Sequence, residues 1–218
     1  MLYSNDRKLS LSGWLQENDI SAYRSPLRLQ KFLFFYEAFS KVNDDVSDFA
    51  RLKGYKRGPV FSPVWGDYTK DRTEFDSVSL EKYHAKQTDI NNLRAKRASF
   101  IVSSLSENEL STLTHRFNIW SAKQQRIMAG EQQVELRESD FSESDYAITQ
   151  ALEQMYPAEM VQNCNIIPMG EKYFVFPKKD LELLTEQHFD TMASLAEHED
   201  LHNPVYVEID NEGRLCVD

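Results

Sequence analysis

The stretch SPLRLQKFLFFYEAF, from Ser25 to Phe39, decides the fold of this chain. Pro26 has no backbone N–H to donate and a preset φ, so it suits the first position of a helix that Ser25 caps. Phe34 and Phe35 widen an apolar face until little of the helix is polar. The other members of that face, at helical spacing, are Leu29, Phe32, Leu33, Tyr36 and Phe39. A helix that is apolar almost all round is buried by its neighbours, so we expect this helix at the centre of the core.

Three polar residues interrupt this helix. Glutamine and lysine are mostly exposed residue types, so we expect the Gln30 and Lys31 side chains to reach solvent along a narrow edge of the helix. A second interpretation is that Gln30 hydrogen-bonds a buried loop. We expect Glu37 to be a carboxylate on the helix surface, with a buried acid as the alternative interpretation.

The bulk composition limits the class of protein. The chain has 218 residues, 41% of them hydrophobic, which suffices for one core or for a main domain with a smaller appendage. No run of 18 apolar residues is present, and the first ten residues lack an apolar signal core. Cys164 and Cys216 lie far apart and form no metal-ligand pattern, so free thiols are expected. These features together predict a cytoplasmic protein.

The charge is unevenly distributed. Residues 1–100 carry 17 Lys and Arg against 13 Asp and Glu, whereas residues 101–218 carry 8 against 22. Nucleic-acid affinity is largely cation–phosphate attraction, so the acidic half argues against a nucleic-acid partner. A basic protein partner would suit it, and ordinary solubility is the other account.

The pattern along the chain predicts a mainly α protein. We expect a compact helical bundle domain over residues 1–130, followed over residues 131–218 by a helical connection and a small mixed α/β extension that begins near residue 160. The stretch FARLKGYKRGPVFSPVW, Phe49 to Trp65, is expected to be a tight, glycine-hinged loop that leads into a helix with Trp65 inward. The expected helices cover residues 5–18, 25–42, 88–104, 106–120, 142–155 and 177–195, and another begins at Ser62–Pro63. We expect a polar connection over residues 19–24, Arg94, Lys96 and Arg97 on the outer face of the 88–104 helix, and a Ser106–Glu109 capping box at the start of the next helix. Short strands are expected at 165–167 and 173–176, as a hairpin, and at 205–209 and 215–217.

No established catalytic motif is present. The sequence lacks GxGxxG, GxxxxGK[ST], HExxH and Cys-x-x-Cys. His198 and His202 are four residues apart but have no evident third ligand, so no metal is expected. His115 lies on an apolar helix without an obvious nucleophile or orienting carboxylate. We therefore predict a protein that is not an enzyme and needs no cofactor, with an enzyme built around His115, Tyr36 and Gln30 as an alternative.

Three stretches together resemble a known family. LRLQKFLFFYEAF (Leu27–Phe39) resembles the LKLQKLLYYAQ-type helix of the Panacea domain, the antitoxin domain of SocA-like and GepA-like bacterial proteins. Phe49–Trp65 is similar to that family's segment with Gly-Pro-Val and a following helix, and Leu113–Thr114–His115 with Trp120 is similar to its third signature. Residues 130–218 have no counterpart in it. The matching motif positions are Leu29, Gln30, Lys31, Gly58, Pro59, Val60, Trp65, Thr114, His115 and Trp120.

The resemblance implies a binding protein. Proteins of this family typically neutralise a toxin encoded beside them by direct contact, some present a bound toxin to a protease, and many lie on prophages or mobile elements. The partner expected here is a cognate toxin from an adjacent gene, with a protease as a second candidate. The residues expected to contact the partner are Tyr55, Arg57, Gly58, Pro59 and Phe61.

One further alternative keeps the family and changes the target. It is a phage or mobile-element regulator that binds DNA or a host protein other than a toxin. Its surface would combine the basic residues of the 51–57 segment, Arg51, Lys53, Lys56 and Arg57, with the basic residues between Arg94 and Arg97.

Overall fold

The computed structural model describes residues 1–217 and is mainly α-helical, with two small sheets. The first part of the chain is almost entirely helical apart from one hairpin and one short strand. Its elements are α1 (Asp6–Asn18), α2 (Ile20–Arg24), α3 (Pro26–Val42), β1 (Leu52–Tyr55), β2 (Gly58–Phe61), α4 (Ser62–Lys70), α5 (Arg72–Ala85), η1 (Gln87–Asp89), α6 (Asn92–Ser104), α7 (Glu107–His115), α8 (Asn118–Ser121), α9 (Gln124–Met128), β3 (Val134–Glu135), η2 (Glu138–Asp140), α10 (Glu143–Met155) and α11 (Ala158–Asn163).

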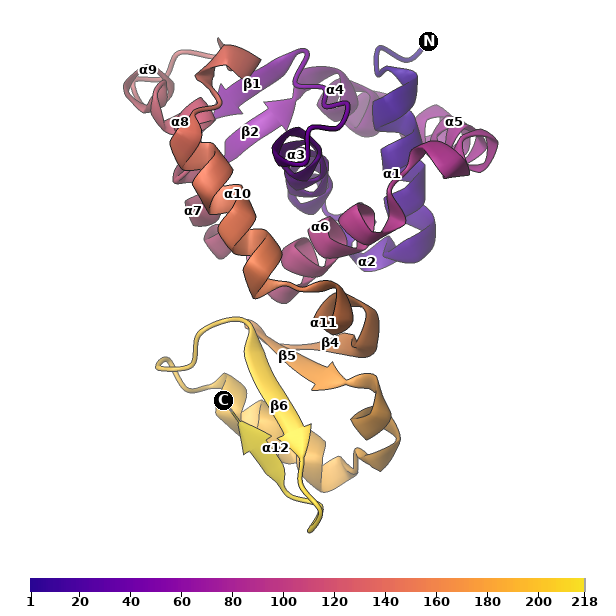
Figure 1. Cartoon of the computed structure of the whole chain (residues 1–218), viewed down its shortest axis with the longest axis vertical. Helices are drawn as coiled ribbons and strands as arrows, with labels where there is room; N and C mark the ends of the chain where they lie inside the picture. The colour runs from indigo at the N-terminus through magenta and orange to yellow at the C-terminus, as the bar shows by residue number, and fades with distance from the viewer. Residues whose placement is uncertain (218) are drawn as a thin grey trace.

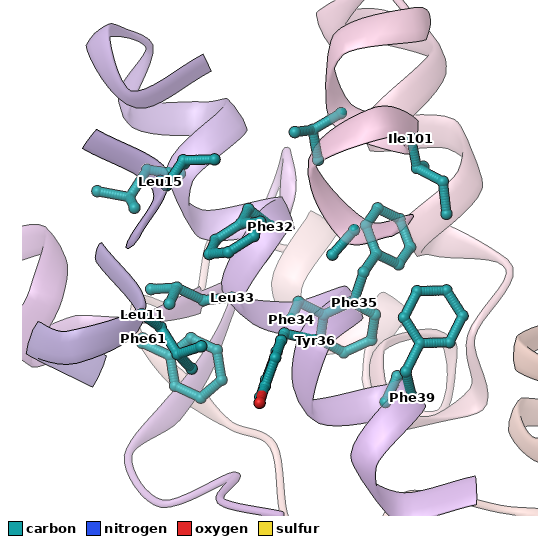
Figure 2. Packing of buried hydrophobic residues seen from close by; sticks show 14 of the residues in the cluster. Leu11, Leu15, Phe32, Leu33, Phe34, Phe35, Tyr36, Phe39, Phe61 and Ile101 are labelled. Atoms are coloured by element: carbon teal, nitrogen blue, oxygen red, sulfur yellow. The ribbon is translucent and has the colours of Figure 1, made fainter. Parts of the chain in front are cut away.

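Helix α3 lies at the centre of the molecule's larger part, as its sequence predicts. The Ser25 side chain accepts a hydrogen bond from the Arg28 N–H at 3.2 Å, and Pro26 occupies the first turn. Figure 1 shows α3 nearly end-on inside a ring that includes α1, α6, α10 and the β1–β2 hairpin. Every residue from Leu29 to Ser40 is buried. Figure 2 shows how its side chains point to opposite neighbours, with Leu33 towards Leu11 and Phe35 towards Ile101.

We expected the segment from Phe49 to Trp65 to be a hinged loop that leads into a helix, but residues 52–61 form an antiparallel hairpin, after which the expected helix α4 begins at Ser62. Strands β1 and β2 pair from Leu52↔Phe61 to Tyr55↔Gly58, which leaves Lys56 and Arg57 as the turn. The sheet order is β2-β1-β3, so β2 is an edge strand. An edge strand tolerates Pro59, which cannot donate to a central ladder.

Glu37 is another correction, because it is completely buried. Its carboxylate accepts hydrogen bonds from Arg7 Nε at 2.8 Å, from Lys8 Nζ and from the Asp48 backbone N–H at 3.0 Å. A buried charge is tolerated only when it is paired and hydrogen-bonded, and this cluster supplies both conditions. Helix α1 is thereby tied to the centre of α3.

After the hairpin, α6 and α7 follow the sequence prediction with local differences, whereas the 14-residue helix α5 was not predicted. The Ser106–Glu109 capping box is present, but α7 ends at His115 and Trp120 belongs to the separate helix α8. Arg94 does not face outward as expected, since it is buried and paired with Asp45 at 2.9 Å. Residues 20–24, expected as a polar connection, form the short helix α2.

The last part of the chain is a mixed α/β unit. Its four-stranded sheet has the order β4-β5-β6-β7, with β5 and β6 parallel and the other pairs antiparallel. The expected helix over residues 177–195 is instead a 3₁₀ segment followed by a shorter helix. The elements are β4 (Cys164–Met169), β5 (Lys172–Pro177), η3 (Lys178–Leu183), α12 (Glu186–Ala196), β6 (Val205–Ile209) and β7 (Leu215–Val217).

The two faces of this sheet belong to different hydrophobic clusters. Successive side chains of a strand point to opposite faces. On β5, Val175 joins the large cluster around α3, whereas Phe174 and Phe176 join a second cluster with Met192 of α12. The sheet therefore separates the helical body from α12, an arrangement that Figure 1 shows below the ring of helices.

Candidate partner-binding groove

Helix α3, the hairpin and α7 meet at Gly58. Lys31 Nζ of α3 donates a hydrogen bond to the Arg57 carbonyl at 2.6 Å. Gly58 has a φ of +105°, and a Cβ at this position would lie 2.1 Å from Lys31 Nζ and 2.5 Å from Thr114 Oγ1. Glycine is required here both by the positive φ and by the lack of space for a side chain.

Gln30 and Lys31 do not reach solvent, which corrects the first interpretation of both residues. Their exposed fractions are 2% and 1%, because the hairpin covers this side of α3. Gln30 Oε1 accepts a hydrogen bond from the Phe61 backbone N–H at 2.8 Å. The second interpretation of Gln30, a hydrogen bond to a buried loop, is thus confirmed, with a hairpin strand in place of the loop.

Helix α8 also holds the hairpin, through a hydrogen bond from Trp120. The Trp120 Nε1–H donates to the Tyr55 carbonyl at 3.0 Å. The His115 ring stacks on the Trp120 ring, with 3.8 Å between centroids and 16° between planes. Three segments that are far apart in sequence therefore meet at the same hairpin, and α3 and α8 hold it through backbone carbonyls of its turn region.

An open groove of about 510 Å³ lies beside this junction. Its walls are largely apolar, and four charged side chains lie among them. The lining residues are Pro26, Leu27, Gln30, Lys31, Tyr55, Lys56, Arg57, Pro59, Val60, Trp65 and Glu107. This volume is in the range of ordinary ligand and peptide pockets.

Two aromatic residues are placed differently from our expectation. Trp65 is 42% exposed at the groove and not in the core, because the inner face of α4 is taken by Val64 and Tyr68. Phe61, expected to contact a partner, is 1% exposed, and its ring packs against Lys8 Nζ at 4.3 Å from the centroid. Tyr55, Arg57 and Pro59 do line the groove.

The charges around the groove are unevenly paired. Arg57 Nη2 contacts Glu107 at 2.9 Å, and Ser25 donates to the same carboxylate at 2.7 Å. Lys31 contacts no carboxylate within the described residues, and burial, with the nearby charge of Arg57, lowers its pKa well below the ordinary value of 10.5. Burial and the nearby Lys31 likewise lower the pKa of His115.

The residues of the alternative enzyme site are not brought together. Gln30 is engaged by β2, and His115 is stacked on Trp120, with its Nε2 buried and lacking a hydrogen-bond partner among residues 1–217. Tyr36 lines a separate cavity with Arg7 and accepts a hydrogen bond from the Asn91 N–H at 3.1 Å. The described part of the chain contains no group of three or more His, Cys, Asp or Glu side chains arranged to hold a metal ion.

Comparison with known proteins adds no relative, since no family model, curated protein or solved structure matches the chain. Across the part of the chain that the structure describes, no helix is long and apolar enough to cross a membrane. The geometry of the groove is therefore the basis for assigning a function.

Proposed function

We propose that this chain is an antitoxin-like protein of the Panacea type that neutralises a cognate toxin by direct protein–protein contact at the groove. In this proposal residues 1–130 form the compact helical bundle domain of that family, and residues 131–218 form an extension of its own. The observation that carries the proposal is the meeting of the three family-like segments at Gly58, beside one groove.

The composition of the groove favours a protein partner. Arg57 and Trp65, both exposed, and Tyr55 are of residue types that contribute much of the binding energy at interfaces when they are desolvated. The walls between them are apolar, which suits side chains of a folded or extended partner. Presentation of the bound toxin to a protease is a variant of the same proposal, with the extension as a second contact surface.

The alternative, a phage or mobile-element regulator that binds DNA or another host partner, has weaker support. Its basic surface would need Arg94 and Arg97, but these residues are engaged with Asp45 and Glu153 at 2.9 Å each. The basic surface is thereby reduced to the hairpin and its flanks. Steep salt dependence of binding to duplex DNA would favour this alternative.

A rescue assay tests the proposal. The adjacent open reading frame is expressed alone and together with this chain, and growth is scored. We expect toxicity alone, restored growth on co-expression, and co-purification of the two proteins. A harmless neighbour, or rescue without contact between the proteins, would contradict the proposal.

Two matched variants assign the surface in the same assay. Trp65 and Phe189 are exposed aromatic residues with similar exposed fractions, 42% and 40%, but only Trp65 lines the groove. We expect Trp65→Ala to weaken rescue and partner binding by at least tenfold, which corresponds to about 1.4 kcal/mol. Phe189→Ala on α12 should leave both unchanged, and equal effects of the two variants would exclude the groove as the contact surface.

A further inference from the structure

Lys31 is a buried lysine without a counter-ion among residues 1–217, and it lies at the wall of the groove. An ammonium group has three donors, and Lys31 Nζ uses one of them, on the Arg57 carbonyl. Burying a charged group is expensive unless another charge or several hydrogen bonds compensate it. Burial lowers the pKa of Lys31 accordingly. Groups perturbed in this way are frequent at binding sites.

A second lysine buried among apolar side chains shows the contrast. Lys8 lies against the Phe61 ring, but its Nζ contacts both Glu37 and, at 3.4 Å, Asp48. Lys8 therefore has two carboxylate partners within the fold, whereas Lys31 has none among the described residues. Both lysines line a cavity, but the cavity at Lys8 is about 240 Å³ and the groove at Lys31 is about 510 Å³, so the lysine without a carboxylate partner is the one at the larger opening.

The charged groups of the groove are complementary to an acid. Three basic residues line it, Lys31, Lys56 and Arg57, against the carboxylate of Glu107. Glu107 is already engaged by Arg57 and Ser25. Its pKa reflects this engagement, since burial raises it but the hydrogen bonds from Ser25 and Arg57 hold it below its ordinary value. The Glu107 carboxylate is therefore already occupied by its two partners, Arg57 and Ser25.

We propose that the groove receives an Asp or Glu side chain of the partner protein, flanked by apolar residues, and that this carboxylate becomes the counter-ion of Lys31. The inference rests on the proposed function in taking a protein as the occupant, and it names the chemistry of the segment that binds. Leu27, Val60 and Trp65 provide the apolar walls for the flanking residues.

Binding gains a charge-assisted hydrogen bond between the partner's carboxylate and Lys31, among the apolar walls of the groove. A carboxylate within contact distance favours the ammonium form of a buried lysine, so binding stabilises the protonated form that burial disfavours. Hydrogen bonds between charged groups are roughly twice as strong as neutral ones. A phosphate backbone would fit less well, because the walls around Lys31 are apolar.

Peptide selection on the intact protein tests this inference without requiring the toxin. The full chain is immobilised, and a displayed library of random 12-residue peptides is selected on it. The most enriched peptide is then synthesised with its acidic residue and with the matching amide, Asn for Asp or Gln for Glu. Both peptides are titrated into the wild-type protein by calorimetry. We expect enrichment of an acidic residue between apolar ones, and an affinity at least tenfold lower for the amide peptide.

Variants of the protein locate the effect. In Lys31→Met the acid and amide peptides should bind equally, whereas Lys179→Met, on the exposed surface of the extension, should keep the full difference. If Lys31→Met does not fold, the comparison of acid and amide peptides on the wild-type protein still decides. Selected peptides without acidic residues, or equal binding of the two peptides to wild type, would overturn the inference. A failed rescue assay beside an intact acid preference would instead remove the toxin as partner and leave the groove chemistry standing.

Discussion

At the scale of single residues, the molecule uses two polar groups of α3 to hold the hairpin in place. Gln30 satisfies a strand N–H, and Lys31 satisfies a turn carbonyl. Both bonds are made to backbone atoms, so they constrain the hairpin whatever its side chains are. This arrangement leaves the Lys31 side chain buried, with no carboxylate partner among the described residues.

The burial of Lys31 predicts a pH dependence of stability. Its pKa is lowered in the native state, by burial first and by Arg57 second; His115 on α7 lies near it, and Tyr55, Lys56 and Glu107 line the same groove. Between the native and the unfolded pKa, the unfolded chain holds a proton that the native chain lacks, so this group's contribution to stability rises with pH. We expect the free energy of unfolding of wild type relative to Lys31→Met to increase between pH 7.5 and 9.5, by at most about 1.4 kcal/mol per pH unit.

Urea denaturation at both pH values measures this contribution. Lys179→Met, a substitution of an exposed lysine, should show the same pH slope as wild type. A stability difference between wild type and Lys31→Met that falls with pH would mean that Lys31 is charged in the native state.

Gly58 and Gly130 allow backbone strain to be separated from steric overlap. Both have a positive φ, +105° and +95°, but a Cβ at Gly130 would meet no described atom within 4 Å. We expect Gly58→Ala to destabilise the protein by roughly 1–3 kcal/mol more than Gly130→Ala, because only the former displaces Lys31 and Thr114. Thermal melting of the two variants tests this, and equal melting temperatures would show that the junction can relax.

The same geometry changes how Gly58→Val should be used. Because the sequence places Gly58 among the residues expected to contact the partner, it predicts that this variant disturbs partner binding more than the fold. With Lys31 Nζ and Thr114 Oγ1 so close, it should damage the hairpin junction itself. Trp65→Ala is the better probe of binding.

At the scale of elements, helix α1 crosses α5 at unusually short range. Gly13 lies at the crossing, where a Cβ would be 2.1 Å from the Ser79 carbonyl oxygen and 2.6 Å from its carbon. These are backbone atoms, which cannot rotate away as a side chain would. The close approach thus depends on one hydrogen atom in place of a methyl group.

Gly13→Ala and Gly66→Ala form a matched pair within helices. Gly66 lies in α4, where an added Cβ would meet no described atom within 4 Å, so alanine there should stabilise by about 0.5–1 kcal/mol through helix propensity. Gly13→Ala should instead destabilise by roughly 2 kcal/mol or more, since α1 and α5 must separate. Denaturant midpoints decide, and stabilisation by both substitutions would show that the α1–α5 crossing is not tight.

The elements also show how far sequence reasoning reaches. Periodicity predicted α3, the Ser106 capping box and the β4–β5 hairpin, because each depends on local residues. It missed the β1–β2 hairpin, whose four-residue strands contain Gly54, Gly58 and Pro59, residues typical of loops. The position of the groove was indicated in the sequence by the Gly58–Pro59 pair. The burial of Lys31 was not predicted, and that of Glu37 was only the second interpretation, since both residue types are almost always exposed and their partners come from distant segments.

At the scale of the whole molecule, the mixed α/β part of the extension, residues 164–217, is fastened to the helical body by a few polar contacts in addition to its apolar face. Arg28 of α3 donates to the Tyr173 hydroxyl at 2.6 Å and lies over that ring. Asn203 connects three places at once: it accepts from the Tyr173 N–H at 2.8 Å, and it donates to Glu109 of α7 at 3.0 Å and to the Glu171 carbonyl at 2.9 Å.

Asn203→Ala should therefore loosen the extension without disturbing the core. We expect faster amide hydrogen exchange in residues 172–177 and 205–209, and unchanged exchange in α3, because local opening follows the contacts that are lost. Asn211→Ala, in the exposed turn before β7, is the control and should resemble wild type. Uniform acceleration over the whole chain would indicate that body and extension unfold as one unit.

The parallel pairing of β5 with β6 has a consequence for synthesis on the ribosome. Strand β5 is made well before Val205 and its neighbours in β6, which pair with the edge of β5. During this interval, and in any prematurely terminated chain that stops short of β6, an apolar strand edge stays open to other nascent chains. Truncated translation products should for this reason be prone to aggregate or to be degraded.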